Sequence, residues 1–143
     1  MLRSILLSFI LLFTVPFVAH AEISAADSAD IDGKIQLFVQ GVNASKTKDA
    51  LYALFVPKAK EKSDMMNTLV VQLDNAVNYT GRPLKVEMVE QKELGAHMIY
   101  RRYIMYSNDI ACKLDIVFFK SSAGWLAQSL YFNDLAIDDF NGQ

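Results

Sequence analysis

Two adjacent arginines, Arg101 and Arg102, lie in the middle of the segment "HMIYRRYIMYSND". A guanidinium group binds carboxylates and carbonyl oxygens through charge-assisted hydrogen bonds. The segment has the alternation of a β-strand, and neighbouring strand residues point to opposite faces of a sheet. One of the two arginines must therefore lie on the face that meets the core. There it is either part of a binding site or a structural charge paired with a carboxylate.

Short turns on either side of this segment suggest which carboxylates pair with the arginines. If Asn108-Asp109 is a two-residue turn, Arg102 lies opposite Asp115. If Gly95-Ala96 is another, Arg101 lies opposite Glu90. Both arginines then have a carboxylate directly across the ladder, and such pairs stabilise a sheet by about 0.2–1 kcal/mol.

Tyrosines and a tryptophan on neighbouring segments complete a candidate site. The residues expected to contact a ligand are Arg101, Glu90, Tyr103, Tyr131 and Trp125. A carboxylate beside a guanidinium is a weak base near neutral pH, so the sequence favours binding over catalysis.

Other reactive side chains give no further site. His97 is the single histidine after residue 21, so no histidine pair is available for a metal site, and neither a metal nor a cofactor is expected. Cys112 lies in an apolar strand and is expected to be a buried, inert thiol. The lysines of "VPKAKEK" (Lys58, Lys60 and Lys62) are expected in a solvated loop.

The predicted helices lie in the first half of the chain after residue 21, and the predicted strands that carry these residues lie in the second half. Apolar residues recur at helical spacing in three segments, which predicts three helices within about 30–80, the first with Asp30 as its N-cap. The period then changes to two, which predicts strands near 84–94, 97–107, 110–120 and 125–134. Connections this short join antiparallel neighbours, so the expected fold is α+β, with helices packed on an antiparallel four-stranded sheet.

Both faces of this sheet are apolar. One face is expected to carry Met88, Glu90, Ile99, Arg101, Tyr103, Met105, Cys112, Leu114, Ile116, Phe118, Trp125 and Tyr131. The other is expected to carry Val89, Met98, Tyr100, Arg102, Ile104, Asp115, Val117, Phe119, Leu126, Leu130 and Phe132. The first has more bulky apolar side chains and is assigned to the helices. A single helical layer covers one face only, so the second predicts a homodimer through the sheet.

The layout resembles the nuclear transport factor two-like (NTF2-like, cystatin-like cone) superfamily. The resemblance rests on the helices, the "YTGRP" junction and a strand meander that ends in "SSAGWLAQSLYFND". It implies a curved sheet that wraps the helices around a conical pocket. The superfamily includes ketosteroid isomerase and dehydratases as well as non-catalytic binding domains, so the fold does not select a function. The expected function is non-enzymatic binding of a small amphipathic or anionic ligand or a protein partner. The alternative is a small isomerase or lyase, for which the resemblance implies Glu90 as the carboxylate base and Tyr103 and Tyr131 as donors to an oxyanion.

The N-terminal segment has the pattern of a cleaved signal peptide. Arg3 precedes an apolar block, and Ala19-His20-Ala21 fits the signal peptidase site. Residues 1–21 are therefore expected to be removed, which leaves a single domain over 22–143 with an acidic tail at 135–143, periplasmic or secreted and without a membrane anchor. That mature chain keeps 13 basic residues against 16 acidic ones, which argues against a nucleic-acid partner.

Overall fold

The computed structural model describes residues 23–136 of the chain. The expected signal peptide, its cleavage site and residues 137–143 of the acidic tail lie outside this range. Within residues 23–136, no helix is long and apolar enough to cross a membrane.

Four helices precede the sheet: α1 (Ala25–Asn43), α2 (Thr47–Leu54), α3 (Pro57–Lys60) and α4 (Ser63–Thr80). The sequence predicted three, and the additional one is the single turn α3. Pro57 lies at the first helical position of α3, where its missing N–H leaves no hydrogen bond unmade. The same proline that prevents α2 from continuing thus begins the next helix.

Helix α1 begins earlier than predicted because Ser24, not Asp30, is its N-cap. The Ser24 hydroxyl accepts a hydrogen bond from the Asp27 N–H at 3.1 Å. The predicted apolar stripe of α1 is confirmed, since Ile31, Ile35, Phe38 and Val42 are all buried.

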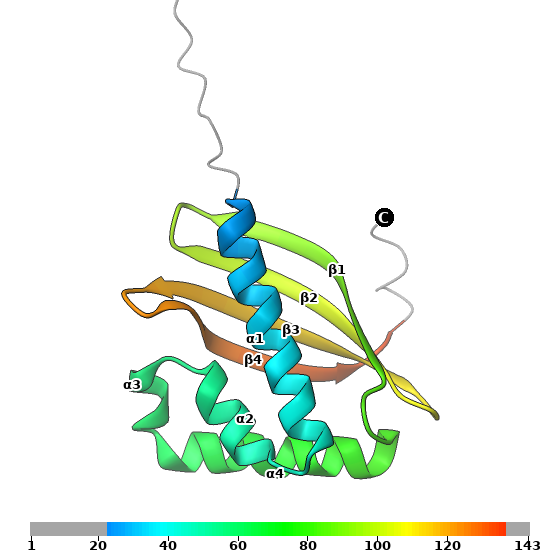
Figure 1. Ribbon diagram of the computed structural model, residues 1–143. Coiled ribbons are helices and arrows are strands. Elements are labelled where there is room, and N and C mark those ends of the chain that lie inside the picture. Colours follow the sequence, from blue (N-terminus) through cyan, green and yellow to red (C-terminus); the bar gives the residue numbers. More distant parts are fainter. Residues whose placement is uncertain (1–22, 137–143) are drawn as a thin grey trace, which may run out of the picture.

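Four strands form one antiparallel sheet in the order β1-β2-β3-β4: β1 (Lys85–Leu94), β2 (Met98–Tyr106), β3 (Ala111–Ser121) and β4 (Gly124–Asp134). This is the predicted meander. Figure 1 shows that α1 crosses one face of the sheet, while α2, α3 and α4 lie beside its β4 edge. We call the face against α1 the inner face and the opposite face the outer face.

The predicted register between β2 and β3 is confirmed, but the predicted register between β1 and β2 is wrong over Glu90 to Leu94. Arg102 lies opposite Asp115, as expected. Glu90, however, lies opposite Arg102, and Gln91 takes the place opposite Arg101. The connection from β1 to β2 is a three-residue turn, Gly95 to His97, and β1 has an irregularity between Met88 and Glu90. A shift of one residue moves a side chain to the other face, and Glu90 therefore lies on the outer face.

A second irregularity exchanges the faces of the distal half of β4. Phe118 pairs with Ala127 but Val117 pairs with Ser129, so Gln128 is an extra residue in β4. Trp125 is on the inner face and buried, as predicted. Leu130 is also on the inner face and buried, whereas Tyr131 lies on the outer face and is 62% exposed. The predicted faces of Leu130, Tyr131 and Phe132 are therefore wrong.

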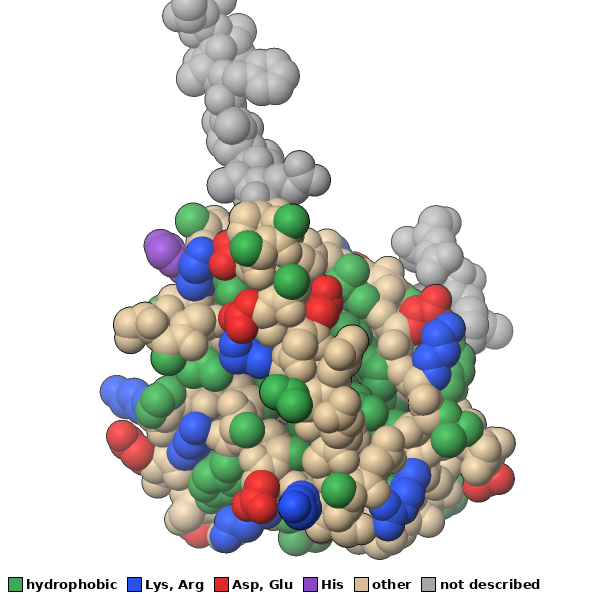
Figure 2. Space-filling model, viewed as in Figure 1, with side chains coloured by type: hydrophobic (Ala, Val, Ile, Leu, Met, Phe, Trp, Pro, Cys, Tyr) green, Lys and Arg blue, Asp and Glu red, His purple; other side chains and the backbone are tan. Residues whose placement is uncertain are grey.

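The core fills the space between α1, α2 and the inner face. Leu51, Leu114, Ile116 and Phe118 have no solvent exposure, and Phe38 is 1% exposed. Cys112 is buried at the margin of this core, as predicted, and burial raises the pKa of its thiol. Charged side chains of both signs are mixed over the helical face in Figure 2, which agrees with the absence of a strong net charge.

Candidate functional site

Arg101 connects α1 to the inner face of the sheet. Its side chain is fully buried, and its Nη1 donates to Asp32 Oδ1 of α1 at 2.7 Å. Its Nε donates to Gln91 Oε1 of β1 at 2.7 Å, and its Nη2 donates to Ser28 Oγ at 2.8 Å. Tyr103 accepts a longer bond from Nη1, at 3.3 Å. Arg101 is therefore a paired structural charge, and its partner is Asp32 rather than Glu90.

Arg102 occupies a second charge network on the outer face. It donates from Nε to Asp115 Oδ1 at 2.8 Å and lies 3.2 Å from Glu90 Oε2. The Tyr100 hydroxyl donates to the same Asp115 oxygen at 2.9 Å. Burial and this hydrogen bond raise the pKa of Tyr100 above its usual range. The sequence assigned Glu90 and Asp115 to different faces of the sheet. In the structure, both carboxylates contact Arg102 on the outer face.

The five predicted site residues do not form one site. Arg101 and Tyr103 lie together on the inner face, but Glu90 is on the outer face and Tyr131 is exposed near the β4 edge. Trp125 is buried at the start of β4, where its backbone N–H donates to Asp30 Oδ2 of α1 at 3.0 Å. The space between α1 and the sheet near Arg101 and Trp125 is filled by buried core side chains.

One cavity remains at the mouth of the cone, between α1 and β1. It has a volume of about 430 Å³, and its walls include Asp32, Gln36, Gln40, Met88 and Tyr103. Only Tyr103 among the predicted site residues lines it. The Asp32 charge is balanced by buried Arg101, and burial raises the pKa of Tyr103.

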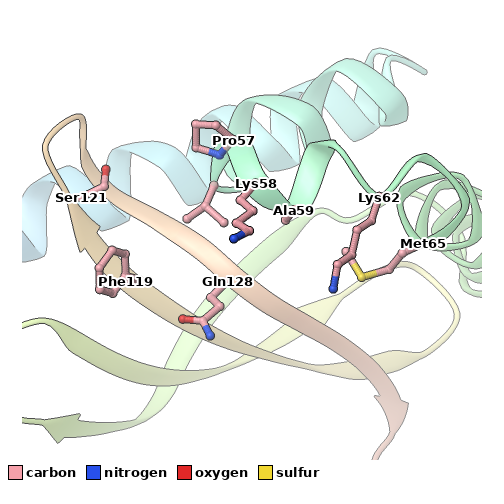
Figure 3. A pocket seen from close by; sticks show the side chains of 9 residues that line it. Pro57, Lys58, Ala59, Lys62, Met65, Phe119, Ser121 and Gln128 are labelled. Carbon is pink, nitrogen blue, oxygen red and sulfur yellow. The ribbon is translucent and has the colours of Figure 1, made fainter.

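A larger cavity lies outside the cone, between α3, the beginning of α4 and the ends of β3 and β4. Its volume is about 580 Å³. Its apolar walls are Val56, Pro57, Ala59, Met65 and Phe119. Lys58 and Lys62 also line it, and Figure 3 shows both side chains on the helical side of the cavity, facing the strands that carry Phe119 and Gln128. We call this cavity the lysine groove.

The side-chain ammonium groups of the two groove lysines have no hydrogen-bond or ion-pair partner among residues 23–136. The sequence predicted a solvated loop for these lysines and did not predict that Lys58 and Lys62 line the same cavity. Lys58 lies in α3 and Lys62 is the N-cap of α4, so the two lysines flank the short connection between these helices. Both line the groove, whereas Lys60 does not. Pro57 before this lysine-rich stretch was the signal that could have suggested a helical turn.

Metal binding has no support in the described part of the chain. No three His, Cys, Asp or Glu side chains within residues 23–136 are placed to hold a metal ion together.

Comparison with known proteins supports the fold. No protein-family model matches the chain. No curated protein matches it significantly in sequence. The chain is similar to the crystal structure, at 2.00 Å resolution, of a Campylobacter jejuni protein provisionally described as an NTF2-like transpeptidase. The two align with a TM-score of 0.52 and 12% sequence identity, over 73% of this chain and 97% of that one.

An identity of 12% carries information about the fold and none about the activity. The helices that precede the sheet, the antiparallel meander and the packing of α1 across its inner face agree with this similarity. The chain therefore has the NTF2-like fold.

Proposed function

We propose that this protein is a non-enzymatic binding domain that takes a small amphipathic anion in the lysine groove. One observation carries the proposal: two cationic side chains without side-chain partners among residues 23–136 border a cavity of about 580 Å³ with apolar walls. Binding sites for small molecules combine apolar walls with a few polar groups that orient the ligand.

The two parts of the groove have different roles in this proposal. Burial of an apolar ligand group against Val56, Met65 and Phe119 supplies most of the affinity, at roughly 25 cal/mol per Å² of apolar surface. The ammonium groups of Lys58 and Lys62 are exposed, so each contributes about 1 kcal/mol or less. Their main effect is to select the sign of the ligand's head group.

Arg101 has no part in this site. The sequence suggested it as the main donor to an anionic ligand, but its donors are engaged by Asp32, Gln91, Ser28 and Tyr103. Lys58 and Lys62 are exposed cations that line the groove and can reach a ligand there.

A second candidate is an isomerase or lyase acting at the mouth of the cone, favoured by the presence of Asp32 and Tyr103 in one cavity. Asp32 would replace Glu90 as the base. One of its oxygens already accepts from Arg101, and Tyr103 is 3% exposed, so binding is the better supported function. If the second candidate is correct, Asp32→Asn abolishes turnover of an enolisable ketone while the fold is retained.

We also propose that the domain acts in the periplasm or outside the cell. The proposal rests on the basic residue, apolar block and Ala19-His20-Ala21 site of residues 1–21. Intact-mass measurement of the exported protein should give a chain that begins at Glu22. Retention of the apolar block in the exported protein would contradict this.

A titration followed by heteronuclear NMR tests the binding function. Octanoate, which has an anionic head group, should shift the amide signals of Val56, Lys58 and residues of β4 near Gln128. Octyltrimethylammonium, which has a cationic head group on the same alkyl chain, should not. The Lys58→Gln/Lys62→Gln variant should bind octanoate roughly three- to tenfold more weakly. Lys60→Gln removes the same kind of charge from α3 without lining the groove and serves as the control. Equal binding of both head groups, or equal weakening by the control, would reject the proposal.

A further inference from the structure

The lysine groove does not end at Met65. A second cavity of about 370 Å³ lies farther along α4, between that helix and β4. Met65 and Gln128 belong to the walls of both cavities. The two cavities therefore adjoin along the β4 edge, and we call the pair the channel.

The channel has a charged end and an apolar end. Lys58 and Lys62 lie at the α3 end. The second cavity is lined mainly by Phe55, Leu69, Leu130 and Phe132, and no charged side chain of residues 23–136 lines it. A molecule that fills both cavities must place an anionic group at one end and an apolar group at the other.

We propose that the ligand is a straight-chain carboxylate. Its head group lies between Lys58 and Lys62, and its hydrocarbon tail passes Met65 to reach Leu69 and Phe132. This inference rests on the proposed function and adds the chemical class of the ligand and the path of its tail.

Met65 lies where the tail must pass from one cavity to the next. Its unbranched side chain has several rotatable bonds and adapts to an apolar chain of irregular path. Its side chain is 38% exposed, so it can change rotamer without displacing the core.

The backbone at this point favours an alkyl chain over an added peptide strand. A peptide would bind the edge of β4 through main-chain hydrogen bonds. The Val56 N–H already donates to the Ala127 carbonyl at 2.9 Å, beside the point where the cavities meet. An alkyl chain needs no hydrogen bonds and is not affected by this contact.

The affinity should therefore depend on chain length. Calorimetric titration with octanoate, decanoate and laurate should give a gain of about two- to fourfold for each added methylene. Leu69→Trp should fill the second cavity and reduce laurate to nearly the affinity of octanoate. Val71→Trp is the matched control, because Val71 lies on the exposed side of the same helix and lines neither cavity.

A measurement on the unmodified protein keeps the test independent of variant folding. In the laurate complex, the terminal methyl group should show nuclear Overhauser contacts to the methyl groups of Leu69 and Leu130. The methylene beside the carboxylate should contact Lys58 or Lys62.

The outcomes separate this inference from the proposed function. If octanoate binding requires the lysines but a longer chain adds no affinity, the tail path is wrong and the proposed function stands. If the terminal methyl contacts other residues, the tail path is wrong as well. If no carboxylate shows lysine-dependent binding, the proposed function fails and this inference fails with it.

Discussion

Arg101 and Arg102 are chemically identical neighbours, but their surroundings give them different weights in folding. The Arg101 side chain is fully buried and donates hydrogen bonds to four side chains. Its removal takes one hydrogen bond away from Gln91 and one from Tyr103. We expect Arg101→Ala to lower the free energy of unfolding by roughly 2–4 kcal/mol, from lost hydrogen bonds and lost packing. Arg102 is partly exposed, and we expect Arg102→Ala to lower it by about 1–2 kcal/mol.

Urea unfolding of both variants beside the wild type measures this difference. Circular dichroism of each folded variant shows whether the native structure is retained before unfolding. Equal losses would contradict the expected difference between the two arginines. A larger loss for Arg102→Ala would mean that the inner and outer faces have been assigned the wrong way round.

Asp27 makes the stability sensitive to acid. A hydrogen bond from Lys120, at 2.9 Å, is the main reason that the pKa of Asp27 falls from 3.8 to about 2. Because the pKa of Asp27 is lower in the folded chain than in the unfolded chain, ionised Asp27 stabilises the fold. This contribution is fully present when the pH is above the unfolded pKa, near 4. This contribution is lost as the pH falls through about 2.

We therefore expect the unfolding midpoint to fall between pH 4 and pH 2, and to fall less steeply in Asp27→Asn. Thermal unfolding as a function of pH is the measurement. Asp49→Asn, at the first turn of α2, is the control for a general charge effect. An unchanged pH dependence in Asp27→Asn would show that other carboxylates, such as Asp30 with its lowered pKa, dominate acid unfolding.

At the scale of elements, the turn between β3 and β4 fixes the position of α1. Gly124 has φ +92°, a conformation that L-residues with a side chain rarely adopt. A Cβ at this position would lie 2.9 Å from Asp30 Oδ2, the oxygen that accepts the Trp125 N–H. Only glycine fits at position 124 without strain, and its small size lets Asp30 of α1 lie close to the start of β4.

We expect Gly124→Ala to lower the free energy of unfolding by about 1–3 kcal/mol, because it combines backbone strain with a displaced hydrogen bond. Gly33→Ala is a useful contrast. Gly33 lies within α1 with nothing within 4 Å of an added Cβ, and we expect a gain of about 0.5–1 kcal/mol. Chemical unfolding of both variants gives the comparison, and a tolerated Gly124→Ala would show that the turn relaxes without moving α1.

At the scale of the whole molecule, the outer face of the sheet is the surface most suited to a second copy of the chain. The described helices lie on the inner face and at the β4 edge, and Val89, Leu94, Phe119 and Tyr131 expose much of their apolar surface. A homodimer through this face remains a prediction from the sequence that the exposed residues support.

Sedimentation at micromolar concentration should show a dimer, and Val117→Lys in the middle of the outer face should give a monomer with unchanged secondary structure. Leu37→Lys is the matched control, since Leu37 is exposed on α1 and lies away from the outer face. A monomeric wild-type protein would contradict the prediction. Dissociation by Leu37→Lys would instead place the interface on the helical side.

Local sequence by itself determined the α+β class, the approximate positions of α1, α2 and α4, and the order of the strands. Apolar spacing in α1 and the change to a two-residue period after Pro83 depend on residues close in the chain, and both are confirmed. The pairing of Arg102 with Asp115 was also predictable, because Asn108 and Asp109 mark a short turn between regular strands.

Only the tertiary structure decided which side chains meet. One additional turn residue, His97, and the extra residue Gln128 in β4 reversed the faces of Glu90 and Tyr131, since side chains alternate along a strand. Asp32 reaches Arg101 across 69 positions of the chain, a contact that no local pattern encodes. The lysine groove likewise exists because packing brings α3 against the ends of β3 and β4. The spacing of apolar residues within one segment does not encode how close that segment lies to another.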